Sequence, residues 1–297
     1  MPIACLLPIL GSALILGVYD ITKKSAVRDN AVMPALFYAT LCGSLFFLAV
    51  SLCRGTFFPL LTAGADGIFF LAIFLKSMIV SASWICVYYA MRDLPISIAV
   101  PIRASSPLWV FFGSLILYHE IPTLLQGAAM LLIFSGYYLF SVFGKLEGIT
   151  FRHSKGLYLI LLGTLIGAGS ALYDKLLLGK MKYPHDAVQF WFSIDLVLIL
   201  GAAYFIRSIL FRKSAPRRIF QWRWSIPITG ILLIGADFLY FYALSIPDTP
   251  ISILSLVRRS DCIISFAVGS IWFHEVNKRK KACALALILL GIVLLAL

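Results

Sequence analysis

Charged residues are scarce in this sequence: they make up 13% of its 297 residues, whereas hydrophobic residues make up 61%. Soluble domains carry roughly a quarter charged residues, and their surfaces must stay largely polar. The apolar residues here also form runs of about 20, the length that crosses a hydrocarbon core as a helix. The composition therefore excludes an ordinary soluble protein and predicts an integral membrane protein.

Motifs for catalysis and for cofactor binding are also missing. The chain has no HExxH, no G-x-S-x-G, no P-loop and no G-x-G-D pair. Its six cysteines lie in apolar runs without CxxC spacing, which argues against a zinc site or a disulfide framework. We therefore expect no enzymatic activity, no cofactor and no metal. Without an ATP site, uphill movement of a solute would have to draw on a proton, ion or substrate gradient.

Acidic residues are few compared with basic ones, 13 against 25, so the net charge is +12. A nucleic-acid-binding protein gathers its basic residues on a folded soluble face. Here most of them lie in short loops between apolar runs, where they act as topology signals. We expect a small-molecule substrate and membrane lipid as partners, and no nucleic acid.

Ten membrane-spanning helices are predicted, so the expected fold class is an all-α polytopic membrane protein. The first run has no basic residue before it, which favours a permanent span over a secretory signal. Short loops such as Lys23-Lys24 and Arg92-Asp93-Leu94-Pro95 separate the runs. The predicted spans are 3–20, 31–52, 67–91, 95–118, 123–143, 156–179, 187–210, 225–245, 250–273 and 281–297.

The basic residues are concentrated in alternate loops. Most of the 25 lie between spans 1–2, 3–4, 5–6, 7–8 and 9–10. The positive-inside rule places these loops in the cytoplasm and both termini outside. The expected location is the plasma or inner membrane, crossed many times.

The second half of the sequence repeats the first, which divides the chain into units 1–148 and 149–297. The matched residues follow the same order in both halves, at shifts of 154 or 155 positions: Tyr19-Asp20 with Tyr173-Asp174, Pro95-Ile96-Ser97-Ile98 with Pro250-Ile251-Ser252-Ile253, Arg103 with Arg258, and His119-Glu120 with His274-Glu275. Five spans per unit would place the two units in opposite orientations. Inverted repeats are typical of secondary transporters, which bind their substrate between the repeats near the midplane.

The segments that close each unit carry a family resemblance. They are Pro101-Ile102-Arg103-Ala104-Ser105-Ser106-Pro107 before His119-Glu120, and Val257-Arg258-Arg259-Ser260 before His274-Glu275. In these motifs the chain resembles the drug/metabolite transporter superfamily, specifically ten-span proteins with two EamA-type repeats. The resemblance implies a central cavity lined by spans 1, 3, 4, 6, 8 and 9. Members of this superfamily usually keep both termini in the cytoplasm, whereas the charges here indicate the reverse.

Ionisable residues inside the predicted spans are the candidate site residues, because such groups are costly in lipid and usually face a bundle interior. Arg103 and Arg258 fall at matching depths, about 12 Å into their spans at 1.5 Å per residue. With Arg259, they would clamp a substrate carboxylate or phosphate. The alternative is internal pairing, which the three-residue spacing of Arg258 and Asp261 favours.

Acidic and aromatic residues complete the candidate set. Asp237 lies in the middle of span 8, where an apolar setting favours its neutral form, so Asp237, like Asp261, is a candidate proton carrier. A permanent partnership between Asp237 and an arginine of span 9 is equally consistent with the sequence. The remaining candidates are either cavity residues or interfacial and packing residues: Tyr19, Asp20, Tyr173, Asp174 and Trp84.

Together these observations predict a secondary active transporter, an exporter or exchanger of a small polar metabolite, working by alternating access. The alternative function is a flippase for a lipid-linked polar substrate.

Overall fold

The computed structural model describes residues 3–62, 67–94, 105–145, 155–210 and 219–261, together with positions 99, 102, 103, 264, 283, 286, 287, 290, 291 and 294. In this part of the chain the regular elements are helices and no strand occurs. They are α1 (Ile3–Val27), α2 (Val32–Cys53), α3 (Phe57–Thr62), α4 (Gly67–Asp93), α6 (Ser106–Tyr118), α7 (Leu124–Lys145), α8 (Lys155–Asp174), the π-helix η2 (Lys175–Lys180), α9 (His185–Leu210), α10 (Ser225–Ser245) and α11 (Ile251–Arg258).

Six of the described helices are long and apolar enough to cross a membrane. They are Ala4–Val27, Val32–Cys53, Gly67–Asp93, Lys155–Lys180, His185–Ile209 and Ser225–Ser245. Two shorter apolar helices, Ser106–Tyr118 and Leu124–Gly136, follow α4 in the sequence. The all-helical membrane architecture expected from the sequence is therefore present. The structure does not establish the count of ten spans.

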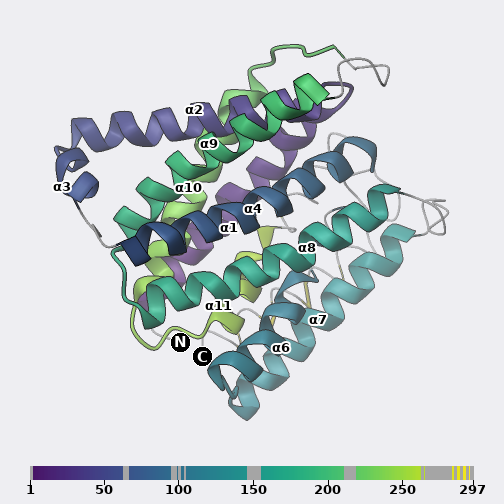
Figure 1. The fold of residues 1–297 in the computed structure, drawn as a ribbon. Helices are drawn as coiled ribbons and strands as arrows, with labels where there is room; N and C mark the ends of the chain where they lie inside the picture. The colour runs from purple at the N-terminus through teal and green to yellow at the C-terminus, as the bar shows by residue number, and fades with distance from the viewer. Residues whose placement is uncertain are drawn as a thin grey trace.

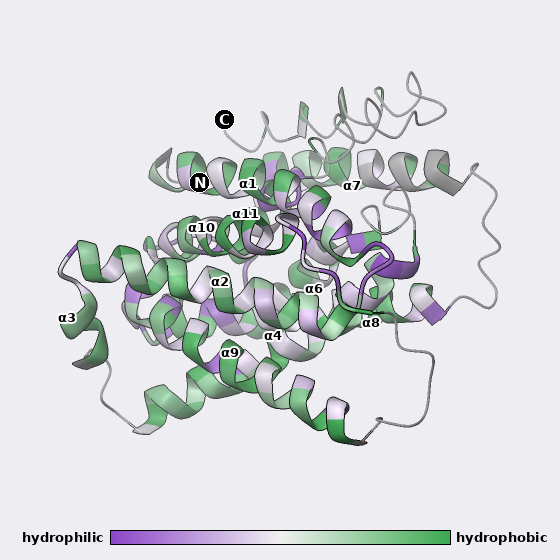
Figure 2. Cartoon of the chain, turned by 90° about the horizontal axis from the view of Figure 1, so that it is seen from above, coloured by the Kyte–Doolittle hydropathy of each residue, from purple (hydrophilic) through white to green (hydrophobic). Residues whose placement is uncertain are grey.

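Apolar side chains cover the surface and charged side chains lie in the interior, the reverse of a soluble protein. Large apolar side chains are exposed on the outer helices, including Leu45 on α2 and Leu198 on α9, and Figure 2 shows these helices as largely hydrophobic. Charged side chains such as Lys76 and Asp20 are instead buried inside the bundle. This arrangement suits lipid as the surrounding solvent.

The long helices pack across the two halves of the chain (Figure 1). Helix α1 lies against α10, and α4 lies against α8. Helix α2 contacts α10, and in the same way α9 contacts α4. Each of these contacts joins a helix from the first half to one from the second, so the centre of the bundle is built by both halves together.

The helices differ from the predicted spans mainly at their ends. Helix α1 continues seven residues beyond the predicted end at residue 20, so Lys23 and Lys24 are helical and do not form a loop. Within this extension Lys23 pairs with Asp20, one turn earlier. Helix α4 likewise includes Arg92 and Asp93, and it ends next to Pro95, as expected since the residue before proline disfavours the helical conformation.

Three predicted spans are described only in part. Span 95–118 is helical from residue 106, with single helical positions before it, and span 250–273 is helical as α11 up to Arg258. Most of span 281–297 lies outside the described residues. The short helix α3 was not predicted.

Candidate functional site

A cavity of about 140 Å³ lies at the centre of the bundle, where the two halves meet. Its wall is formed by α1, α4, α6, α8, α10 and α11, with Phe192 from α9 and with Arg103 just before α6. Seven of the candidate residues line it: Tyr19, Trp84, Arg103, Asp174, Asp237, Arg258 and Arg259. Asp20 and Asp261 are buried behind the wall, and Tyr173 does not line the cavity.

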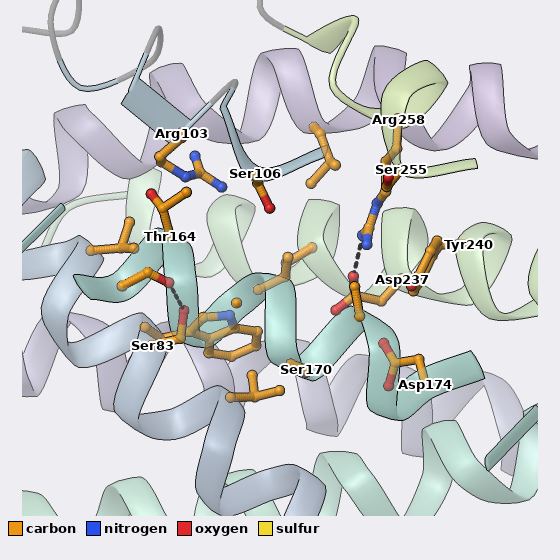
Figure 3. A pocket seen from close by; sticks show the side chains of 18 of the residues that line it. Ser83, Arg103, Ser106, Thr164, Ser170, Asp174, Asp237, Tyr240, Ser255 and Arg258 are labelled. Atoms are coloured by element: carbon orange, nitrogen blue, oxygen red, sulfur yellow. Dashed lines mark hydrogen bonds and ion pairs between the residues drawn. The ribbon is translucent and has the colours of Figure 1, made fainter. Parts of the chain in front are cut away.

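Arg103 and Arg258 lie at opposite ends of this cavity (Figure 3). Arg103 lies near the hydroxyl groups of Ser106 and Thr164, whereas Arg258 lies on the side of Asp237 and Asp174. The two ends therefore have different polar groups, although the two arginines occupy equivalent positions in the sequence.

At the Arg103 end, Asp20 binds two cations. Arg103 Nη1 and Lys23 Nζ each donate to Asp20 Oδ1, both at 2.6 Å. The Lys23 ammonium also lies 4.3 Å from the centre of the Tyr19 ring, a cation–π contact. Asp20 and Lys23 are both fully buried, so this carboxylate is needed to hold both positive charges in the interior.

The arginines pair internally, which was the alternative interpretation of the sequence, but Arg258 does not take Asp261, the partner that the spacing favours. Asp261 Oδ2 instead lies 3.5 Å from Arg259 Nη1. Helix α11 ends at Arg258 and the chain turns at Arg259, so two residues three positions apart no longer share a helical face. The turn directs the side chains of two neighbouring arginines to different carboxylates.

At the other end, Arg258 is the partner of Asp237. Arg258 Nη2 donates to Asp237 Oδ1 at 2.5 Å, and its guanidinium lies 4.1 Å from the centre of the Tyr240 ring. This pairing matches the second interpretation of Asp237, as the partner of an arginine in span 9. Arg258 Nε is buried and has no hydrogen-bond partner among the described residues.

A second ion pair at this end joins Lys76 on α4 to Asp174 at the end of α8. The Lys76 ammonium also lies 4.4 Å and 4.5 Å from the rings of Phe192 and Phe241. Asp174 is therefore a partner of Lys76. The corresponding residue of the first half, Asp20, has different partners, so the two Tyr-Asp motifs lie in different surroundings.

Hydroxyl groups line much of the remaining wall. Ser83 Oγ donates to Gly163 O at 2.7 Å, Thr164 Oγ1 to Ile160 O at 2.6 Å, and Ser255 Oγ to Ser252 O at 2.9 Å. Because each hydroxyl hydrogen is used by a backbone carbonyl, each oxygen is left to act as an acceptor.

Of the aromatic residues on α4, Trp84 and Tyr88 line the cavity. Tyr89 does not; the guanidinium groups of Arg92 and Arg207 lie 5.3 Å and 5.1 Å from the centre of its ring.

Two lysine side chains that do not line the cavity bind backbone carbonyls near its two ends. Lys24 Nζ donates to Met91 O and Leu94 O, at 2.6 Å and 2.7 Å. At the opposite end, Lys175 Nζ donates to Thr249 O at 2.5 Å. Beside it, Glu120 accepts hydrogen bonds from the backbone N–H of Ile251 and of Ser252, the first residues of α11.

Sequence reasoning missed Lys23 as a site residue, because two adjacent lysines after an apolar run resemble a cytoplasmic loop. The spacing of Asp20 and Lys23, three positions apart, was the available signal, since such residues meet on one helical face. The serines and Thr164 carried no comparable signal, because small hydroxyl residues are common in membrane helices.

Among the described residues, no group of three or more His, Cys, Asp or Glu side chains could hold a metal ion.

The described helices, their apolar outer surface and their charged interior define a multi-pass α-helical membrane protein. The model of the EamA-like transporter family matches residues 3–142 of this chain. This match covers just under half of the 297 residues, so the likeness to that transporter family concerns the first half of the chain.

The fold has a counterpart among solved structures. A structure described only as "Crystal structure of protein" aligns with 98% of this chain and 96% of its own, with a TM-score of 0.71 and 14% sequence identity. A likeness at that identity concerns the fold alone. None of the curated proteins matches the sequence.

Proposed function

We propose that the protein is a secondary active transporter, an exporter or exchanger, that moves a small polar metabolite through the central cavity. The observation that carries this proposal is the cavity itself, a space of about 140 Å³ lined by charged and hydroxyl groups inside an apolar bundle. Ionisable residues buried in a membrane protein mark solute pathways. The EamA-like match over residues 3–142 supports the same class.

Two inverted repeats, 1–148 and 149–297, would account for the way the halves pack. The contacts α1–α10 and α4–α8 exchange equivalent helices of the two halves, as do α2–α10 and α9–α4. In such an arrangement access alternates as one half moves against the other around a fixed site. The basic loops 1–2, 3–4, 5–6, 7–8 and 9–10 would then face the cytoplasm of a plasma or inner membrane.

Coupling to a proton gradient is proposed for Asp237, with Asp261 as a second candidate. Asp237 lies in the cavity wall and holds Arg258. Protonation of its carboxyl group would release Arg258, and this change links the charge state of the site to its geometry.

The test is transport in proteoliposomes by the unmodified protein and by Arg103→Ala and Arg258→Ala variants. We expect uptake of the substrate to fall about 10- to 100-fold, since each variant loses a charge-assisted hydrogen bond in the cavity. Arg54→Ala, at an exposed position after α2, is the matched control and should transport normally.

Unchanged transport in both variants would contradict the role of the arginines. Transport of lipid-linked cargo alone, with no free metabolite moved, would instead favour the flippase function.

A further inference from the structure

Basic side chains outnumber acidic ones at the Arg103 end of the cavity. At the Arg103 end, three cations face two carboxylates: Lys23, Arg103 and Arg259 with Asp20 and Asp261. We call these five residues the cationic cluster. Its members interact electrostatically with one another, and Asp20 and Asp261 are almost fully buried.

The other end of the cavity is balanced. Lys76 pairs with Asp174, and Arg258 pairs with Asp237. Two cations therefore meet two carboxylates in these ion pairs. Among the described charged residues that line the cavity or pair with a lining residue, bases outnumber acids by one, and the extra base belongs to the cationic cluster. Asp195, half-buried on α9 beside Ser77, lies outside this set.

This surplus places a specific demand on a ligand. A buried charge without a counter-charge is costly, and a bound ion of opposite sign removes the cost. One negative charge neutralises the cluster, whereas two would leave a negative surplus in the same interior. Lys23 and Arg103 share the single oxygen Asp20 Oδ1, so each keeps further N–H donors for a carboxylate.

The rest of the wall indicates what accompanies that carboxylate. The hydroxyls of Ser83, Thr164 and Ser255 donate to backbone carbonyls, so they offer acceptors to a ligand that brings its own donors. The acids of the cavity are already held by Lys76 and Arg258, which disfavours an ammonium group as that donor. Neutral hydroxyl groups fit better.

The volume limits the size of the ligand. One ordered water takes about 10–15 Å³ of such space, so the cavity holds on the order of ten waters. Its volume of about 140 Å³ thus suits a ligand of a similar number of non-hydrogen atoms.

We propose that the cavity binds a small hydroxylated monocarboxylate, with its carboxylate between Lys23, Arg103 and Arg259 and its hydroxyls against wall hydroxyls such as those of Ser83 and Thr164. This inference rests on the proposed function, since it takes the cavity as the transport site. It makes Lys23 a specificity-determining residue and leaves Arg258 as the partner of Asp237, so the two arginines have different roles.

The test measures binding of a series of three-carbon ligands to the purified full-length protein, by thermal shift and by calorimetry. Glycerate is the probe, and it carries one negative charge and two hydroxyls. Glycerol lacks the charge, and serine has an ammonium group in place of one hydroxyl. Glycerol 3-phosphate has a second negative charge, and propionate lacks the hydroxyls. We expect glycerate to stabilise the protein in proportion to its concentration and to bind about tenfold or more tightly than each of the others.

Variants of Lys23 test whether this residue binds the carboxylate of the ligand. Lys23→Met should weaken glycerate binding about 10- to 100-fold and abolish the preference over glycerol. This variant keeps Asp20 paired with Arg103, so the fold is retained. Lys23→Arg should keep the preference, and Lys155→Met, at an exposed position, is the matched control for loss of one positive charge.

The proposal is overturned if serine or glycerol 3-phosphate binds more tightly than glycerate, or if Lys23→Met binds glycerate as the unmodified protein does. The order of ligand affinities is measured on the unmodified protein, so it tests the proposal even where a variant is poorly folded. Transport assays separate this inference from the proposed function. Binding of glycerate without transport of any solute would contradict the function, whereas transport of another solute without glycerate binding would contradict only the ligand.

Discussion

At the scale of single residues, the site combines groups that are permanently paired with groups that retain capacity for a ligand. Lys76 and Asp174 satisfy each other in an aromatic pocket, and their charges cancel. Asp20 is shared between Lys23 and Arg103, so its two partners are only partly satisfied. Removing one member of the first pair leaves a buried charge, whereas the shared carboxylate can lose one partner and remain paired.

Asp237 is the residue at which proton coupling can be tested. Asn at this position cannot titrate, yet it keeps an oxygen that can accept from Arg258. In Asp237→Asn we expect accumulation of substrate against its gradient to fall to a ratio of about 1, while exchange of internal for external substrate continues, because exchange needs no net proton movement. Gradient-driven uptake and counterflow in proteoliposomes measure the two processes separately.

Asp93→Asn is the control for this prediction, because Asp93 is an exposed acid paired with Arg92 at the end of α4. It should alter neither process. Uphill accumulation by Asp237→Asn would show that the coupling site lies elsewhere.

At the scale of helices, close approach between α2 and α10 depends on two glycines. A Cβ atom added to Gly230 would lie 1.9 Å from Ala39 O, and one added to Gly43 would lie 2.5 Å from Gly230 O. Small residues at such crossings let two membrane helices approach backbone to backbone. Since α10 also carries Asp237, this contact helps to fix one wall of the cavity.

Replacing Gly230 by alanine should separate the two helices. We expect Gly230→Ala to lower the free energy of unfolding by about 1–3 kcal/mol, the cost of overpacking a tight contact. Gly169 on α8 is the matched control, because nothing lies within 4 Å of the position its Cβ would take. Gly169→Ala should instead be neutral or stabilise the helix by up to about 1 kcal/mol. Denaturant unfolding in detergent compares the two, and equal effects would contradict the packing argument.

At the scale of the whole molecule, the two halves of the chain make matching lysine contacts. Lys24 binds Leu94 O at the end of α4, and Lys175 binds Thr249 O after α10. Leu94 and Thr249 are 155 positions apart, the same shift that relates Arg103 to Arg258. The two lysines are not equivalent in sequence, so each half reaches the same contact with a different residue.

These contacts predict opposite effects on access to the cavity. In a background without the natural cysteines, a cysteine in place of Ser170 reports access, since Ser170 lines the cavity. Lys24→Met should raise its labelling by a membrane-impermeant thiol reagent about tenfold from the side of loop 1–2, and Lys175→Met should do so from the opposite side, because each loses a charge-assisted hydrogen bond. Lys155→Met should change neither rate. Increased labelling from the same side in both variants would contradict two separate closures.

Much of the architecture follows from local sequence patterns. Apolar runs of span length and paired Arg, Tyr-Asp and His-Glu motifs are sufficient to predict a helical membrane protein with charged residues inside. Most helix positions follow as well, because a helix in lipid satisfies its own backbone hydrogen bonds. Seven of the ten predicted site residues line the cavity, and five of these are charged, as expected because charges in such helices avoid lipid.

Partner choice depends on geometry that spacing cannot supply. The sequence by itself determined that acids and bases lie inside the bundle, but the turn after Arg258 decided that Asp237 rather than Asp261 is its partner. The extension of α1 brought Lys23 to Asp20 and created a surplus charge at one end of the cavity. Only the tertiary structure could decide this, because the balance of charge at a buried site depends on which side chains from distant helices come within a few ångströms of one another.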